Sequence, residues 1–279
     1  MQQSLQSGSG QSGSEQSGSE QSGLGQRRLS MRLAQDHEDL VAVQKLRWKV
    51  FLAERHAAAD LGPRENLDSD IYDALCDHLL VIDEDAAPEE RVVGTYRLLR
   101  ESVARRGFGF YSSSEFDLGV LTRESGGDRG DLLELGRSCV LPPYRTSSTI
   151  SLLWRGIAEY IARHNISLMF GCASFPGTDP DAHAAALSYL YHQHLAPVES
   201  RPIVLAEKGV SLERLPSGSY DERQALLSLP PLIKGYLRTG AKFGDGAYID
   251  HDFGTVDVFV VMPVERISSR YAARFSVAA

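Results

Sequence analysis

Hydrophobic positions near the start of the chain predict a strand, a helix and a pair of strands. Residues 29–33 alternate between apolar and polar in the manner of a short strand. Asp36 can cap a helix whose apolar residues recur at helical spacing, namely Leu40, Val43, Leu46, Val50 and Phe51. Two strands are expected at 78–82 and 92–99 with an acidic turn between them, and Gly94 marks a bulge or a close backbone approach.

The middle of the chain carries the most informative pattern, a buried strand that leads through a short polar loop into an amphipathic helix. The strand is expected at 132–140 and the helix at 147–164. Residues 101–130, which precede them, are rich in Gly, Ser and Arg and are expected to form loops with one short helix. The remaining elements are a strand, a helix capped by Asp181 and two further strands: 167–173, 181–194, 247–249 and 256–261.

Strands and helices in this mixed order predict an α/β or α+β fold, with a mixed central sheet flanked by helices. The domain is expected to span 28–279, with a C-terminal extension from about residue 200, because the pattern weakens beyond Pro197. Residues 1–27 differ: the segment 11–15 nearly repeats as 16–20, and the stretch has almost no apolar side chains. We therefore expect a disordered, low-complexity leader.

Composition narrows the class of protein. The net charge of −8 argues against nucleic acid as a partner, although residues 91–163 hold eleven Arg against eight acidic residues. The three cysteines have no metal-type spacing, so we expect reduced thiols and no metal site. The leader lacks the features of a secretion signal, and no apolar run is long enough to span a bilayer, so a cytoplasmic protein is expected.

Two features of the strand–loop–helix segment carry candidate chemistry. The helix start Arg145-Thr146-Ser147-Ser148 presents backbone N–H groups that can bind a phosphate, or its hydroxyls serve only as caps. Glu134 and Arg137 interrupt an apolar strand, and a buried ionised group needs a partner or a task. For each of these two residues, a structural ion pair is the alternative to a role in catalysis.

Two other reactive side chains have plain alternatives. Cys139 is better explained as a small core residue than as a nucleophile, because no base lies near it in the sequence. Tyr189, on the helix at 181–194, either packs or donates a proton to a departing thiolate. The histidines of this helix do not have the spacing of a zinc site.

These motifs together resemble the GNAT acyltransferase superfamily, and within it the acyl-homoserine-lactone synthases, which use acyl carrier protein thioesters. The residues that carry this resemblance are Arg47, Phe51, Arg97, Glu134 and Arg137. Five segments resemble the L-ornithine Nα-acyltransferases more closely: 76–81, 94–99, 134–140, 187–192 and 229–238. The resemblance covers about residues 29–275 and implies a GNAT-like fold.

The resemblance also implies an activity, the transfer of a 3-hydroxyacyl chain from acyl carrier protein to the α-amine of L-ornithine. The product is lyso-ornithine lipid, an intermediate of ornithine lipid biosynthesis. Glu134 is then the general base, and Arg137 and Arg97 order the active-site carboxylates or hold the substrate's carboxylate. Arg47 and Phe51 flank the amine pocket.

Further roles follow from the same resemblance. A bulged strand leaves a backbone N–H near Ser138, Cys139 and Val140 to polarise the thioester carbonyl, and Tyr189 is the candidate acid for the thiolate. In the superfamily this tyrosine falls seven residues after a helix cap, which from Asp181 gives Ser188 rather than Tyr189.

The donor is expected on the phosphopantetheine arm of acyl carrier protein, held by Arg145, Thr146, Ser147 and Ser148, with no bound cofactor. Serines stand where an acetyl-coenzyme A loop has glycines, which favours the arm over coenzyme A. Leu152, Leu153 and Ile157 are expected to line the acyl channel, and Arg145 and Arg155 to dock the acidic carrier protein. Because the product is a single-chain lipid, peripheral contact with the inner membrane surface is also expected.

Two alternatives stay open. The acceptor can be another amine, such as glycine, glutamine or a polyamine, because amine pockets differ by few side chains. The chain can also be a non-catalytic module that binds acyl carrier protein or a lipid, against which Glu134 and Arg137 argue.

Overall fold

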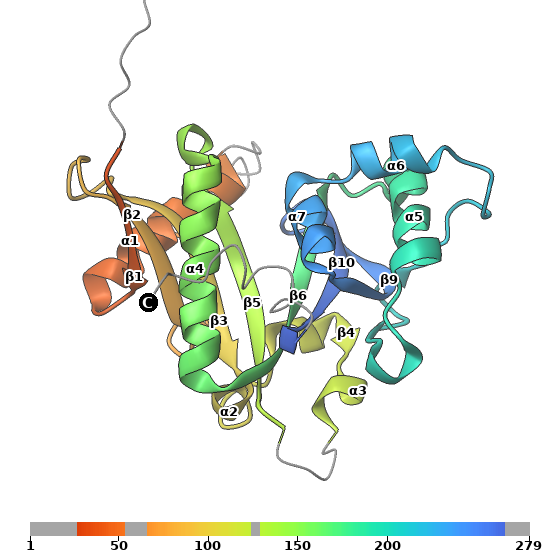
Figure 1. The fold of residues 1–279 in the computed structure, drawn as a ribbon, viewed down its shortest axis with the longest axis horizontal. Coiled ribbons are helices and arrows are strands. Elements are labelled where there is room, and N and C mark those ends of the chain that lie inside the picture. Colours follow the sequence, from red (N-terminus) through yellow and green to blue (C-terminus); the bar gives the residue numbers. More distant parts are fainter. Residues whose placement is uncertain (1–26, 54–65, 124–128, 266–279) are drawn as a thin grey trace, which may run out of the picture.

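The computed structural model describes residues 27–53, 66–123 and 129–265 (Figure 1). The leader expected at 1–27 falls almost entirely outside the described residues. The described chain forms one large mixed sheet with helices on both faces, so the predicted α/β architecture is confirmed.

Nine strands follow one another across the sheet in the order β1-β2-β3-β5-β6-β10-β9-β7-β4, and β8 pairs with β9. Neighbouring strands are antiparallel except for β5–β6 and β7–β9, which are parallel. The main strands are β1 (Leu29–Leu33), β2 (Asp77–Asp83), β3 (Val92–Arg100), β5 (Asp131–Val140), β6 (Ile166–Pro176), β9 (Lys242–Asp250) and β10 (Thr255–Pro263). Three short strands complete the sheet: β4 (Phe116–Asp117), β7 (Ile203–Val204) and β8 (Gly209–Val210).

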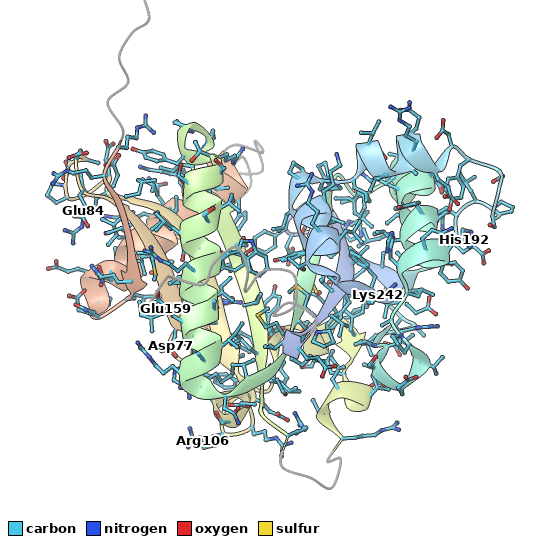
Figure 2. All side chains as sticks on the ribbon, in the orientation of Figure 1. Asp77, Glu84, Arg106, Glu159, His192 and Lys242 are labelled. Carbon is cyan, nitrogen blue, oxygen red and sulfur yellow. The ribbon has the colours of Figure 1, made fainter. Side chains whose placement is uncertain are left out.

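Helices cover the two faces of the sheet. On one face α4 (Ser147–His164) packs Leu153 and Ile157 against the large core, and on the other α1 (His37–Trp48) packs Val43 and Leu46 against Leu80. The other helices are α2 (Glu101–Ala104), α3 (Gly119–Thr122), α5 (Ala184–His194), α6 (Glu222–Ser228) and α7 (Pro231–Thr239). Exposed charged residues such as Glu84, Arg106 and Glu159 lie at the edges of the molecule (Figure 2).

The parallel strands β5 and β6 separate within the sheet. Their pairing runs from Asp131 opposite Ile166 to Glu134 opposite Phe170, while the strands continue to Val140 and Pro176. Figure 1 shows the two strands diverge beyond this point. An opening therefore forms in the middle of the sheet, beside the strand that the sequence singled out.

Two irregularities lie next to this opening. Between β3 and β5 the register shifts so that Arg137 and Ser138 together oppose Tyr96, and Arg137 has φ of +48°. A non-glycine residue in this conformation is strained and persists only where its surroundings hold it. The second shift, between Val81 and Ile82 opposite Gly94, confirms the bulge predicted at that glycine.

Most predicted elements are present, and two predictions were wrong in detail. Asp181 does not cap the helix at 181–194: a 3-10 turn (Pro180–His183) is capped by Asp179, and α5 begins only at Ala184. Asp181 instead accepts a hydrogen bond from Arg214 at 2.9 Å. Residues 101–123 hold two short helices, a 3-10 turn and β4, more order than the single short helix expected. Local composition does not show that these pieces pack on β5 and β6, which is what orders them.

Candidate active site

A cavity of about 670 Å³ lies where β5 and β6 diverge. Leu153, Trp154 and Tyr236 line it from the side of α4, and Tyr72 and Glu134 line it from the opposite face of the sheet. The cavity therefore passes through the sheet, with an apolar end towards α4 and α7 and a polar end on the far side. Its volume suits a small-molecule site.

The structure brings eight of the thirteen predicted site residues to this cavity. They are Phe51, Arg97, Glu134, Arg137, Ser138, Cys139, Val140 and Arg145. The residues that do not line it are Arg47, Thr146, Ser147, Ser148 and Tyr189.

Glu134 is buried, and its carboxylate faces a short backbone turn. Its Oε2 accepts from the N–H of Tyr111 at 2.8 Å, and its Oε1 accepts from the N–H and the hydroxyl of Ser112 at 2.8 and 2.6 Å. Burial raises the pKa of Glu134, and the bonds from Ser112 and Tyr111 act against that rise. A carboxylate has about four lone-pair sites, so these three bonds leave room for one more donor.

Three arginines and three aspartates form a buried ionic network beside the cavity. Arg97 donates to Asp70 at 2.7 Å and to Asp73 at 3.2 Å, and Arg137 lies 3.3 Å from both Asp68 and Asp70. The guanidinium of Arg137 also stacks over the rings of Tyr111 and Phe253, at 4.9 and 4.6 Å. Of the two roles predicted for Arg97 and Arg137, these contacts match the ordering of carboxylates.

Arg47 completes the network and does not reach the cavity. Its side chain is fully buried, with Nη1 and Nη2 bonded to the carboxylate of Asp73 at 2.9 and 2.6 Å and Nε 2.8 Å from Asp68. Although burial alone raises the pKa of Asp73, the contacts with Arg47 hold it well below its ordinary value. The placement of Arg47 does not support its predicted role beside the substrate amine, because α1 directs this side chain towards the 68–73 segment, whose acids neutralise its charge.

Three carboxylates at the polar end were given no assigned role from the sequence. Glu115, Asp250 and Asp257 all line the cavity, and Cys172 donates its thiol to Glu115 at 3.3 Å. Burial, followed by the negative charge of Asp257, raises the pKa of Glu115 to about 8. These acids come from the end of a 3-10 turn, from β9 and from β10, so no local motif joins them.

Tyr189 lies on α5, away from the cavity, with its ring 5.1 Å from that of His194. Its neighbour Ser188 caps the backbone N–H groups of Arg214 and Leu215 at 2.9 and 2.8 Å. The placement does not support the predicted role of Tyr189 as acid, because α5 packs on α6 and β9 instead of on the opening.

Two other phenols line the cavity itself. The hydroxyls of Tyr96 and Tyr236 lie 3.2 Å apart at the cavity, and Tyr96 also hydrogen-bonds the side chain of Ser138. Tyr236 belongs to the 229–238 segment that the sequence analysis singled out without assigning it a role. Periodicity alone makes it a packing residue of α7.

The start of α4 stands beside the cavity mouth. Thr146 caps the helix by accepting from the N–H of Thr149, and Ser147 and Ser148 are exposed. Arg145 lines the cavity, and its Nε donates to the carbonyl of Val140 at 3.0 Å.

The predicted acyl-channel and docking residues of α4 have different surroundings. Leu153 lines the cavity, whereas Ile157 is fully buried in the core and Leu152 packs at its edge. Arg155 is exposed, 3.8 Å from Glu159.

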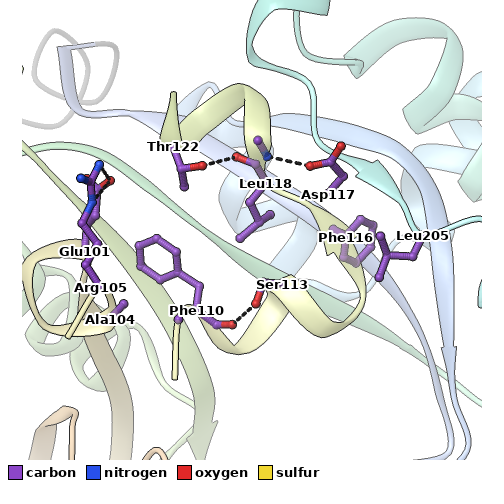
Figure 3. Close-up of a pocket in the computed structure, with 12 residues that line it drawn as sticks. Glu101, Ala104, Arg105, Phe110, Ser113, Phe116, Asp117, Leu118, Thr122 and Leu205 are labelled. Atoms are coloured by element: carbon purple, nitrogen blue, oxygen red, sulfur yellow. Dashed lines mark hydrogen bonds and ion pairs between the residues drawn. The ribbon is translucent and has the colours of Figure 1, made fainter. Parts of the chain in front are cut away.

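A second cavity of about 620 Å³ lies among α2, β4 and α3 (Figure 3). Phe110, Phe116 and Leu118 form its apolar lining, and the carboxylate of Glu101 at its edge is held by Arg105 and Arg129, each at 2.8 Å. Asp117, the other acid of its lining, accepts from the backbone N–H of Gly119 at 2.8 Å.

Within the described ranges, no group of three or more His, Cys, Asp and Glu side chains is arranged to hold a metal ion. Nor does any described helix have the length and apolar character needed to cross a membrane.

Comparison with known proteins gives a consistent picture. The acetyltransferase (GNAT) domain family matches residues 46–155. The L-ornithine N(alpha)-acyltransferase of Agrobacterium fabrum is 46% identical over 250 residues, which cover 88% of this chain and 85% of that protein. The enzyme of the same name from Rhizobium meliloti is 46% identical over 259 residues, covering 89% and 86%.

Among solved structures, the coenzyme A-dependent acyl-homoserine lactone synthase BjaI, with SAM and isopentyl-CoA, superposes with a TM-score of 0.50. It is 13% identical, and the match covers 90% of this chain and 92% of that one. At this identity the likeness concerns the fold alone, and the predicted GNAT-like fold is confirmed.

Proposed function

The chain belongs to the family of the L-ornithine Nα-acyltransferases, and we propose that it transfers a 3-hydroxyacyl chain from acyl carrier protein to the α-amine of L-ornithine. The product is lyso-ornithine lipid. One observation carries the proposal: the cavity joins an apolar end, suited to an acyl thioester, to an acid-lined end, suited to a cationic amino acid. The two substrates thus meet inside the sheet.

The thioester carbonyl is placed against the bulge of β5. A bulge leaves ladder groups unpaired, so a backbone N–H in the segment 138–140 can donate to the carbonyl oxygen. Such a donor stabilises the negative charge that develops on this oxygen during attack by the amine. Direct attack then forms the amide without an acyl-enzyme.

Glu134 is the base that receives the proton of the attacking amine. An α-ammonium group with a pKa of about 8 to 9.5 must lose its proton before or during attack. Glu134 precedes Ser138 by four residues, a strand distance of about 13 Å, so water molecules must relay the proton from the amine to the carboxylate. The raised pKa of the buried Glu134 suits a proton acceptor.

The departing thiolate takes its proton from the phenol pair. Tyr236 lines the cavity from α7 and is hydrogen-bonded to Tyr96, which in turn contacts Ser138 next to the bulge. In this proposal a hydroxyl of the pair protonates the sulfur that leaves the carbonyl, the task first assigned to Tyr189.

The donor reaches the cavity from the start of α4. We expect the phosphate of the phosphopantetheine arm at the backbone N–H groups of Ser147 and Ser148, which follow the helix cap Thr146, with Arg145 at the mouth. Arg145 and Arg155 give the acidic carrier protein a basic contact, whose strength should fall as salt rises. Peripheral contact with the inner membrane surface, where the lipid product belongs, is part of the same proposal.

The test incubates purified protein with 3-hydroxyacyl-loaded acyl carrier protein and a panel of free amino acids, and identifies the product by mass spectrometry. Acylated ornithine supports donor and acceptor together. Acylation of glycine, glutamine or a polyamine instead would keep the reaction and overturn the acceptor. No acylation of any amine, with carrier protein still bound, would favour a non-catalytic binding module.

A further inference from the structure

The polar end of the cavity is built around one face of β10. Thr255 and Asp257 are two residues apart on this strand and therefore point to the same side of the sheet. Thr255 lies opposite Asp250 on β9, and Asp257 lies opposite Ser174 on β6. All four residues line the cavity, so β10 and its two neighbours, β6 and β9, contribute to one polar wall.

Three carboxyl groups, those of Glu115, Asp250 and Asp257, lie on this wall. Glu115 stands close enough to Asp257 and Asp250 for their charges to raise its pKa to about 8, after the larger effect of burial. Glu115 accepts a hydrogen bond from the neutral thiol of Cys172, and Asp250 accepts from the backbone N–H groups of Asp252 and Phe253, at 2.8 and 2.9 Å. Neutral hydrogen-bond donors thus orient Glu115 and Asp250.

A buried hydroxyl on the same wall has no partner within the described chain. The side chain of Thr255 is 1% exposed and lines the cavity, and its Oγ1 makes no hydrogen bond to any described residue. Buried polar groups are nearly always hydrogen-bonded, because an unpaired one costs free energy. A ligand N–H that enters between Thr255 and the acids would supply the missing bond.

We propose that Asp257, Asp250 and Glu115, together with the hydroxyl of Thr255, bind the side-chain ammonium of the acceptor and thereby select a diamino acid. An ammonium group has three N–H donors and one positive charge, which matches carboxylates and a hydroxyl grouped around one point. The α-amine must stay near Glu134 and the bulge, so the side-chain ammonium is the group free to occupy this wall. The inference rests on the proposed function, in that it takes the acceptor to be an amino acid.

The test compares L-ornithine with L-norvaline, which has the same carbon chain without the terminal amine. For the wild type we expect kcat/KM for ornithine to exceed that for norvaline at least about 100-fold, because a site built to hold an amine rejects an analogue that lacks it. Asp257→Asn should lower kcat/KM for ornithine about 30-fold or more, and leave that for norvaline within a factor of about three. Thr255→Val should give a smaller loss of the same kind.

The neighbouring exposed acid Asp252 offers a matched control. Asp252→Asn makes the same change of charge beside the wall, and both kinetic constants should stay at the wild-type level. Turnover of norvaline shows that a variant is folded; if Asp257→Asn does not fold, calorimetric binding of ornithine and norvaline to the wild type decides alone.

The outcomes separate this inference from the proposed function. The inference would be overturned if the wild type used the two amino acids equally, or if Asp257→Asn kept its preference for ornithine. Either result would leave the proposed acyltransferase activity unaffected. Failure of the wild type to acylate any amino acid would overturn the proposed function itself.

Discussion

Two buried groups of charges flank the same cavity, and they are organised in opposite ways. On the side of α1 and β3, Arg47, Arg97 and Arg137 are paired with three aspartates of the 68–73 segment, so cations and anions balance. On the side of β9 and β10, Glu115 and Asp250 are held by neutral donors, and Asp257 raises the pKa of Glu115.

The difference separates support from recognition. In a balanced network each buried charge has a counter-charge within the protein, so the desolvation of these groups is compensated without a ligand. Such a network can fix the shape of the site. A group of acids that neutral donors orient attracts a cation that enters between them. The two groups should therefore respond differently to substitution, the first in stability and the second in acceptor binding.

The largest effect is expected where the balanced network is broken. Arg47→Met leaves Asp73 and Asp68 buried without their main counter-charge and should lower the free energy of unfolding by about 3–5 kcal/mol. Urea unfolding followed by circular dichroism measures this loss. The matched change at the exposed pair of Arg28 and Asp85, Arg28→Met, should leave the unfolding midpoint close to that of the wild type. Equal midpoints for the two variants would contradict a supporting role for the network.

Glu134 lies between the two groups, and its removal tests the chemical step. Glu134→Gln should lower kcat about 100- to 1000-fold, the usual contribution of a general base, while KM for the acyl donor changes little. Steady-state kinetics with thiol release as the readout separates these constants. A variant that retained wild-type turnover would show that another group takes the proton.

The acid wall should give the enzyme a pH dependence that the balanced network does not. Glu115 has its pKa raised to about 8, so it is largely protonated below that pH and ionises as the pH rises through it. KM for ornithine should therefore fall up to about tenfold between pH 7 and 9 in the wild type, relative to Glu115→Gln. The titration of the substrate's α-amine affects both proteins equally, so the difference between their pH profiles reports on Glu115 alone. Parallel profiles would contradict the assignment.

The same raised pKa predicts the sign of a change in stability. The folded pKa of Glu115 lies above its ordinary value of 4.5, so folding favours the protonated form and the wild type loses stability as the pH rises from about 4.5 through 8. Glu115→Gln carries no such charge and should unfold at a higher temperature than the wild type at pH 9. Near pH 5 the two melting temperatures should differ less.

The smallest effect is expected at the donor end, where the phenol pair assists the leaving group. Tyr236→Phe should lower kcat about tenfold, since a thiolate is a fair leaving group without help. Tyr189→Phe, on the far side of α5, is the matched control and should change kcat less than twofold. If Tyr189→Phe were the slower variant, the assignment of the acid to Tyr236 would be wrong.

Most of the helices and strands, and the strand–loop–helix segment beside the cavity, could be predicted from local sequence patterns. The spacing of hydrophobic residues predicted the 132–140 strand and the 147–164 helix with bounds that differ by at most one residue from those of β5 and α4. Helix caps, strand alternation and turn chemistry are local properties of the sequence, so they can be read without the fold. The motif residues Arg97, Glu134 and Arg137 were found for the same reason: charges inside an apolar strand are conspicuous without any fold. Family resemblance added the class of reaction, which the comparisons support.

Which side chains line the cavity together depends on the tertiary structure. Arg47 belongs to the ionic network because α1 directs it towards the aspartates of the 68–73 segment. Tyr189 lies away from the cavity because α5 packs on β9. Glu115, Asp250 and Asp257 meet because β10 inserts between β6 and β9, a pairing between segments some 80 residues apart. Burial and mutual repulsion, which raise the pKa of Glu115, exist only once that pairing has formed. Local pattern carries no record of such long-range contacts, and the chemistry of the acceptor end depends on them.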